Sequence, residues 1–63
     1  MTHITWEEPF CSEGANCFRI GTDPEGNAYI AVAGQESHYL TDSREALGAL
    51  IRGIKAGHAD HLL

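Results

Sequence analysis

Two cysteines and four histidines are the side chains in this sequence that could hold a metal ion. His58 and His61 would share one face of a helix, and with Cys11 and Cys17 they would complete a Cys2His2 zinc set. Zinc sites usually keep their cysteines about two to four residues apart, whereas five residues lie between Cys11 and Cys17. Both histidines also follow Gly57, where the last helix is expected to end. We therefore predict surface histidines with no metal and no cofactor, and keep a small zinc-binding module built on the cysteines and histidines as the alternative function.

Cys17 is also a candidate nucleophile. A thiol becomes reactive when a nearby base or positive charge lowers its pKa from the usual value of about 8.5, and His38 could supply that base if the strands pair suitably. A half-buried, reduced cysteine that acts as a small apolar residue is the commoner case. Glu7, Glu8 and Glu13 cluster acids near the N-terminus, but a short chain has little room to enclose a pocket, so a solvated acidic face is preferred. We expect no catalytic residues and no enzyme.

The start of the chain, Met1-Thr2-His3-Ile4, lacks the basic residues and apolar run of a signal peptide. No apolar stretch approaches the roughly 20 residues that span a bilayer. We therefore predict a cytoplasmic protein in which both cysteines are reduced. A disulfide between Cys11 and Cys17 is the alternative, because their close spacing permits one in an oxidising environment.

Alternating apolar and polar residues predict short β-strands before the C-terminal third of the chain. We expect strands near residues 3–7, 17–21, 28–33 and 38–41. The residues Asp23-Pro24-Glu25-Gly26 have the types that a type I turn favours, so they should connect the second strand to the third. Each strand is close in sequence to the next, which favours antiparallel hairpins.

One segment has the spacing of an amphipathic helix. Leu47, Leu50, Ile51 and Ile54 recur at i, i+3, i+4 and i+7, which predicts a helix over residues 44–56 with a single buried face. Ser43 is the expected N-cap and Gly57 the expected stop, and residues 58–63 are expected to be an irregular tail.

A chain of 63 residues has room for one core, so residues 1–63 should form a single domain. The elements predict an α+β fold in which a small antiparallel β-meander of three to four strands packs against one C-terminal α-helix. The predicted core takes apolar side chains from one face of the sheet and from the helix: Trp6, Phe18, Ile20, Ile30, Val32, Leu40, Leu47, Leu50, Ile51 and Ile54. Tyr29 and Tyr39 on the opposite face of the sheet, together with Glu36, are the predicted partner-binding residues.

The charge of the chain restricts its partners. The sequence has nine Asp and Glu residues and four Lys and Arg residues, and its formal net charge of −5 repels both phosphate and anionic lipid. Direct binding to nucleic acid or to a membrane is therefore not expected, whereas a basic protein surface is a suitable partner. A domain of this size buries only about 60% of the surface of its unfolded chain, so dimerisation or docking on a partner is also expected.

The order of features along the chain carries a resemblance to a known family. Trp6 is followed by Glu-Gly-Ala-Asn-Cys-Phe-Arg-Ile at residues 13–20, by the strand at residues 29–32, and by a helix capped at Ser43 that ends in Gly-Ile-Lys-Ala-Gly at residues 53–57. This order spans almost the whole chain. It resembles the actinobacterial family described as domain of unknown function 397, which includes the BldB-like developmental regulators.

The resemblance implies a small regulatory protein that acts beside helix-turn-helix transcription regulators of the Xre type, in arrangements likened to toxin and antitoxin pairs. It also implies self-association as a homodimer. Both implications agree with the charge, because an acidic module can engage a basic DNA-binding protein while avoiding DNA itself. We therefore expect a small acidic protein-interaction module that binds and modulates such a regulator.

Overall fold

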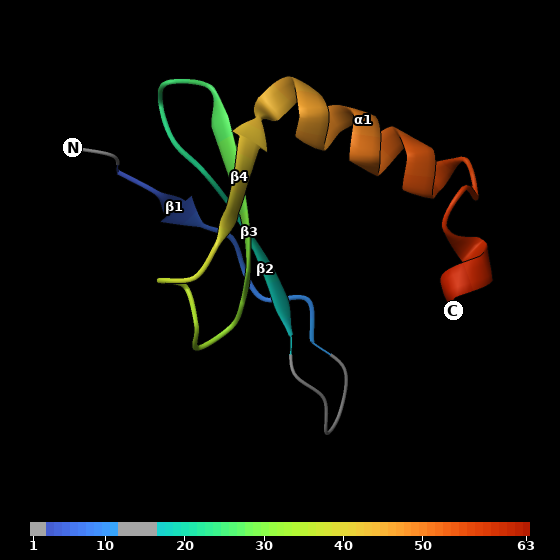
Figure 1. The fold of residues 1–63 in the computed structure, drawn as a ribbon, viewed down its shortest axis with the longest axis horizontal. Coiled ribbons are helices and arrows are strands. Elements are labelled where there is room, and N and C mark those ends of the chain that lie inside the picture. The colour runs from blue at the N-terminus through green and yellow to red at the C-terminus, as the bar shows by residue number, and fades with distance from the viewer. Residues whose placement is uncertain (1–2, 12–16) are drawn as a thin grey trace.

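A computed structural model of the chain describes residues 3–11 and 17–63. Within them, four antiparallel strands form one sheet in the order β1-β2-β3-β4, followed by the helix α1 and a short 3-10 helix η1 (Figure 1). The predicted α+β fold, an antiparallel meander with one C-terminal helix, is confirmed. Glu13 and the rest of the predicted loop at residues 12–16 lie outside the described residues.

The strands cover Thr5–Trp6 (β1), Phe18–Thr22 (β2), Asn27–Val32 (β3) and Leu40–Ser43 (β4). The largest difference from the predicted bounds is in β4, which begins two residues after the expected start at residue 38. A turn at residues 35–38, closed by a 3.0 Å hydrogen bond from the His38 amide to the Gln35 carbonyl, delays the strand. β4 instead extends to Ser43, directly before the helix.

The connection between β2 and β3 is the predicted turn. The Gly26 amide donates to the Asp23 carbonyl, and the Asp23 carboxylate accepts 3.0 Å hydrogen bonds from the amides of Glu25 and Asn27. The Asp23 carboxylate therefore stabilises the turn of the hairpin. In the resulting register between β2 and β3, Ile20 pairs with Ile30.

The helix α1 covers Arg44–Lys55 and starts without any linker after β4. The Ser43 hydroxyl accepts a 3.1 Å hydrogen bond from the Ala46 amide, as expected of an N-cap. Gly57, with φ of +89°, ends the helix, and the His58 amide donates back to the Gly53 carbonyl. The tail was expected to be irregular, which is wrong for Asp60–Leu62, because these residues form η1.

The two faces of the sheet differ from the prediction. Tyr29 was expected on an accessible surface, but it is only 4% exposed and lies in the core with Ala31. The N-terminal segment crosses this face, so Trp6 packs on Tyr29 with ring centroids 6.4 Å apart, and Tyr39 meets Tyr29 edge-on at 4.9 Å. We call the sheet face that bears these three rings the aromatic face.

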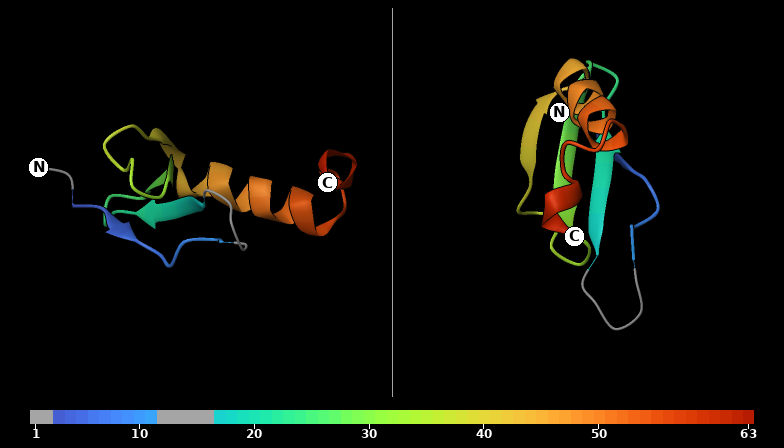
Figure 2. Two further views of the ribbon diagram at one scale, coloured as in Figure 1. Left: turned by 90° about the horizontal axis from the view of Figure 1, so that it is seen from below. Right: turned by 90° about the vertical axis from the view of Figure 1, so that its right-hand side faces the viewer.

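The opposite face, which the sequence predicted to be the core, is only partly covered: Ile20, Ile30 and Val32 are half-buried there. Phe18 is 65% exposed there, and Leu40, Leu50, Ile51 and Ile54 are also exposed. The physical cause is the direct junction between Ser43 and Arg44: the helix leaves the end of β4 and extends past the sheet instead of folding back across it (Figures 1 and 2). Only the start of α1 covers the sheet, over the buried Ala28.

Gly21 supplies a test of which face is the closed one. A Cβ atom at Gly21 would lie 2.8 Å from both Ile4 Cγ2 and Trp6 Cε3, so Gly21→Ala should lower the free energy of unfolding by about 1–3 kcal/mol through overpacking. At Gly53 in the helix the nearest atom would be His58 Nδ1 at 3.7 Å. Gly53→Ala should therefore raise the free energy of unfolding by about 0.5–1 kcal/mol. Urea denaturation of both variants checks this, and equal effects would contradict the closed aromatic face.

Candidate functional site

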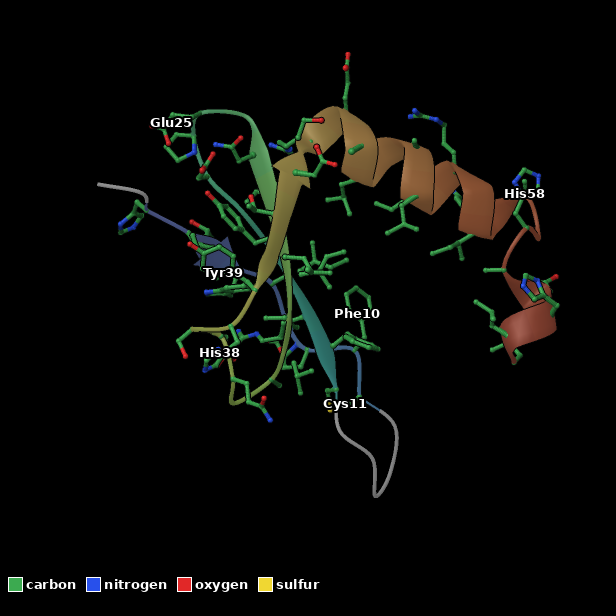
Figure 3. The ribbon with its side chains drawn as sticks, in the orientation of Figure 1. Phe10, Cys11, Glu25, His38, Tyr39 and His58 are labelled. Carbon is green, nitrogen blue, oxygen red and sulfur yellow. A yellow bond between two sulfur atoms is a disulfide. The ribbon has the colours of Figure 1, made fainter. Side chains whose placement is uncertain are left out.

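The helix and the open face of the sheet enclose an apolar hollow, which we call the apolar trough. Its main part has a volume of about 610 Å³. Aromatic and aliphatic side chains from the N-terminal segment, the strands and the helix line it, with one cation at the far end of the helix: Phe10, Phe18, Ile20, Ile30, Leu50, Ile51, Ile54 and Lys55. Figure 3 shows Phe10 on the side of the sheet that faces the helix, and Tyr39 on the other side.

The register of the sheet builds the floor of the trough. Ile20, Ile30 and Leu40 are paired across β2, β3 and β4 and therefore lie in one row on one face. Phe10 pairs with Phe18 in an isolated bridge, and Phe18 pairs with Val32, so these three residues form the next row on the same face. A second hollow of about 370 Å³ near the start of α1 shares Ile30 and Leu50 with the main part. The two hollows thus form one continuous apolar surface.

The helix supplies the roof of the trough, and its apolar stripe has little cover. Leu50, Ile51 and Ile54 are between 43% and 51% exposed, although their spacing is that of a buried helix face. Helical stability in a protein comes mainly from packing of such a face. The structure therefore presents a hydrophobic stripe whose cover is incomplete within this chain.

Cys11 and Cys17 form a disulfide, which corrects the prediction of reduced thiols. Their Cα atoms are 4.6 Å apart, close to the spacing of a pair in an antiparallel ladder that does not share backbone hydrogen bonds. They come to that position because the neighbouring residues Phe10 and Phe18 pair, with a 2.8 Å hydrogen bond from the Phe10 amide to the Phe18 carbonyl. The disulfide therefore fastens one wall of the trough to β2.

A one-residue bulge brings the cysteines into register. Trp6 pairs with Gly21 and Phe10 with Phe18, so three residues on the N-terminal segment oppose two on β2. Pro9 lies in this bulge, where its missing amide hydrogen interrupts no ladder hydrogen bond. The Arg19 Nε donates a 3.0 Å hydrogen bond to the Glu7 carbonyl across the bulge. Sequence spacing alone does not reveal this extra residue, which is why the sequence predicts reduced cysteines and offers the disulfide only as an alternative.

The metal and thiol sites that the sequence offered as alternatives are not assembled among the described residues. Cys11 and Cys17 bond to each other, His38 lies in the connection between β3 and β4, and His58 lies past the end of α1 (Figure 3). Among residues 3–11 and 17–63, no group of three His, Cys, Asp or Glu side chains is close enough to hold a metal ion. A Cys17 thiolate paired with His38 is likewise not formed, because the sulfur is in the disulfide.

The predicted partner-binding residues do not form one surface. Tyr29 is buried, and its hydroxyl donates a 2.5 Å hydrogen bond to Asp23. Tyr39 is 42% exposed at the edge of the aromatic face. Glu36 is half-buried and forms an ion pair with Arg19 at 3.1 Å. The pKa of Glu36 is lowered mainly by the hydrogen bond from the Gly34 amide, and Arg19 lowers it further. This carboxylate therefore stabilises the turn that follows β3.

Asp23 is the most strongly perturbed acid among the described residues. The pKa of Asp23 is lowered from 3.8 to about 2, mainly by the hydrogen bond from the Tyr29 hydroxyl. Hydrogen bonds from Asn27 and Glu25 lower the pKa further, whereas desolvation of the carboxylate raises it. The Asn27 Nδ2 also donates to this carboxylate at 3.0 Å. All of these partners belong to the hairpin or the aromatic face. Asp23 therefore connects the turn to the closed core, away from the trough.

Comparison of the chain with known proteins finds no match among protein-family models, curated proteins or solved structures. The resemblance to the BldB-like family therefore stays a prediction from the order of residues. In the part of the chain that the structure describes, no helix combines the length and the apolar content needed to cross a bilayer.

The disulfide should contribute measurably to stability. Replacing both Cys11 and Cys17 with Ser should lower the free energy of unfolding by about 2 kcal/mol, because the reduced chain regains the entropy of a short open loop on unfolding. Urea denaturation with and without dithiothreitol measures the effect. The reductant should destabilise the wild-type protein and leave the double variant unchanged; a wild-type protein indifferent to reductant would contradict the role of the disulfide.

The lowered pKa of Asp23 predicts an acid-sensitive stability. Its ionised form is favoured in the folded state, so its contribution is complete above the unfolded pKa of 3.8 and is lost as the pH falls toward about 2. Asp23→Asn should be less stable at neutral pH and should lose less stability over that acidic range. Thermal unfolding across pH measures this, with Glu25→Gln in the same turn as the control. Parallel losses in the wild type and in Asp23→Asn would contradict it.

Proposed function

We propose that this chain is a small regulatory protein-interaction module, which acts by stoichiometric binding and without catalysis. The observation that carries the proposal is the apolar trough, a continuous hydrophobic surface formed by a strand row and an uncovered helix stripe. Exposed apolar surfaces of this kind on small proteins are typical of sites that another polypeptide covers. Among the described residues that line the main part of the trough, Lys55 is the one charged residue, so they do not supply the converging polar groups that orient a small substrate.

The regulated partner that we propose is a basic helix-turn-helix transcription regulator of the Xre type, bound in an antitoxin-like manner. Two arguments support it: the net charge of −5 attracts a DNA-binding protein and repels DNA, and the order of residues resembles the BldB-like regulators. Glu7 and Glu8 are exposed on the N-terminal segment and contribute to that field. The same negative charge disfavours direct contact with nucleic acid.

The rate of association with an Xre-type regulator from the same organism should fall stepwise as negative charges are removed from this chain. Each Glu→Gln change removes one negative charge, so Glu7→Gln with Glu8→Gln takes the net charge from −5 to −3, and Glu7→Lys with Glu8→Lys takes it from −5 to −1. The association rate constant, measured by surface plasmon resonance, should fall at each step, by roughly tenfold for the double reversal at low salt.

An unrelated basic protein of similar charge serves as the control, and it should give no saturable complex. The proposal fails if no Xre-type regulator of the organism binds, or if binding responds to neither salt nor these substitutions.

A further inference from the structure

We infer that the disulfide between Cys11 and Cys17 is a thiol-exchange site that switches the apolar trough between two forms. While the bond is intact, it holds Phe10 beside Phe18 as a wall of the trough. When small thiols reduce the bond, Phe10 leaves β2 and the trough loses that wall, while the aromatic face stays closed. The inference rests on the proposed function in one respect, because it makes binding in the trough depend on the state of the two sulfurs.

Phe10 is weakly attached to β2 apart from the covalent bond beside it. It is 65% exposed, so packing does little to hold its ring. Its amide donates a 2.8 Å hydrogen bond to the Phe18 carbonyl, and the two residues form an isolated bridge outside the named strands. The preceding residue, Pro9, has no amide hydrogen to donate. The link at the adjacent Cys11 therefore decides whether Phe10 remains against the strand.

The rest of the sheet is held by contacts that do not involve the disulfide. β2 is paired with β3 along its whole length, and the Ala33 amide donates a 2.7 Å hydrogen bond to the Cys17 carbonyl. On the aromatic face, Trp6 packs on Tyr29. Reduction therefore releases the segment around Phe10 without opening the sheet, which gives the switch two folded forms.

The two sulfurs differ in access to solvent. Cys11 is exposed and Cys17 is half-buried, and Figure 3 shows Cys11 near the end of β2. A small thiolate therefore attacks the Cys11 Sγ, the bond between the two cysteines breaks, and Cys17 leaves as a thiolate that takes up a proton. Exposed disulfides are the labile ones in proteins, whereas structural disulfides resist reduction by small thiols.

A second small thiol completes the reduction. It attacks the sulfur of the first small thiol in the mixed disulfide and releases Cys11, which also takes up a proton. The products are two cysteine thiols and one disulfide of the small thiol. Two electrons and two protons thus pass from the two small thiols to the protein.

The state of the sulfurs and the occupancy of the trough are linked. An occupant that contacts Phe10 binds the oxidised form more tightly, and by reciprocity it favours the disulfide by the same factor. A tenfold preference for the oxidised form lowers the reduction potential of the cysteine pair by about 30 mV. The pair thus reports the occupancy of the trough as well as controlling it.

Nuclear magnetic resonance of the full chain tests the release of Phe10. Nuclear Overhauser effects between Phe10 and Phe18 should lose about nine-tenths of their intensity when dithiothreitol reduces the bond, whereas those between Trp6 and Tyr29 should remain. The double variant Cys11→Ser with Cys17→Ser should match the reduced protein with or without reductant. Phe10 contacts that survive reduction would overturn the switch, and so would a simultaneous loss of both sets of contacts, because the chain would then simply unfold.

Glutathione buffers test whether small thiols operate the site. Mass spectrometry after labelling with iodoacetamide counts the free thiols as the ratio of reduced to oxidised glutathione is varied. Cys11 and Cys17 should become labelled together and reversibly, and the loss of the Phe10–Phe18 contact should follow the same curve. A bond that dithiothreitol reduces but that glutathione leaves intact at every ratio is a permanent cross-link, and this result would overturn the switch.

Binding of an Xre-type regulator from the same organism tests the coupling to the trough. Reduction should weaken binding to the wild type about tenfold. Phe10→Ala is the matched control, because it keeps the disulfide but lacks the ring, and its weaker binding should not change on reduction. Equal binding by both forms of the wild type would overturn the coupling. If no such regulator binds at all, the proposed function fails, and the magnetic resonance result still decides the release of Phe10 by itself.

Discussion

The junction between β4 and α1 is the constraint on which the arrangement of the molecule depends. Ser43 is at once the last residue of the strand and the N-cap of the helix, and its hydroxyl binds the Ala46 amide. The helix begins directly at the end of β4, so no connecting loop carries it back across the sheet. The helix therefore extends past the sheet, and the apolar row at Ile20, Ile30 and Leu40 stays open beneath it.

The closed core follows from the opposite end of the chain. The N-terminal segment covers the other face, where Gly21 lets Ile4 and Trp6 approach the sheet. Tyr29 then lies beneath Trp6 and beside Tyr39, and its hydroxyl is satisfied by the Asp23 carboxylate that also closes the β2–β3 turn. One acid thus stabilises both the hairpin and the only described face that is fully packed.

The sequence predicts the local structure well because local chemistry decides it. The acid, proline and glycine from Asp23 to Gly26 specify the turn, and Ser43 with Gly57 specifies the ends of the helix. The alternating sequence pattern of β3 also places Tyr29 and Ile30 correctly on opposite faces of the sheet. It cannot show which of the two faces is covered, since both faces are apolar. That choice depends on the direction of α1 and on the path of the N-terminal segment, which are tertiary properties. For this reason Tyr29 was predicted on an accessible surface but is buried, whereas Phe18 and Leu40 were predicted in the core but are exposed. Trp6 was predicted on the face toward the helix but packs on Tyr29.

The disulfide shows how a single unpredicted residue changes the site. Without the bulge at Pro9, Cys11 would not face Cys17 and Phe10 would not face Phe18. The bulge moves both residues into register, so the covalent bond lies next to the aromatic pair that forms a wall of the apolar trough. The Trp6–Tyr29–Asp23 cluster is held by packing and hydrogen bonds that do not involve the cysteines. The disulfide, a covalent cross-link between the N-terminal segment and β2, therefore stabilises the open face, where non-covalent packing within the chain is weakest.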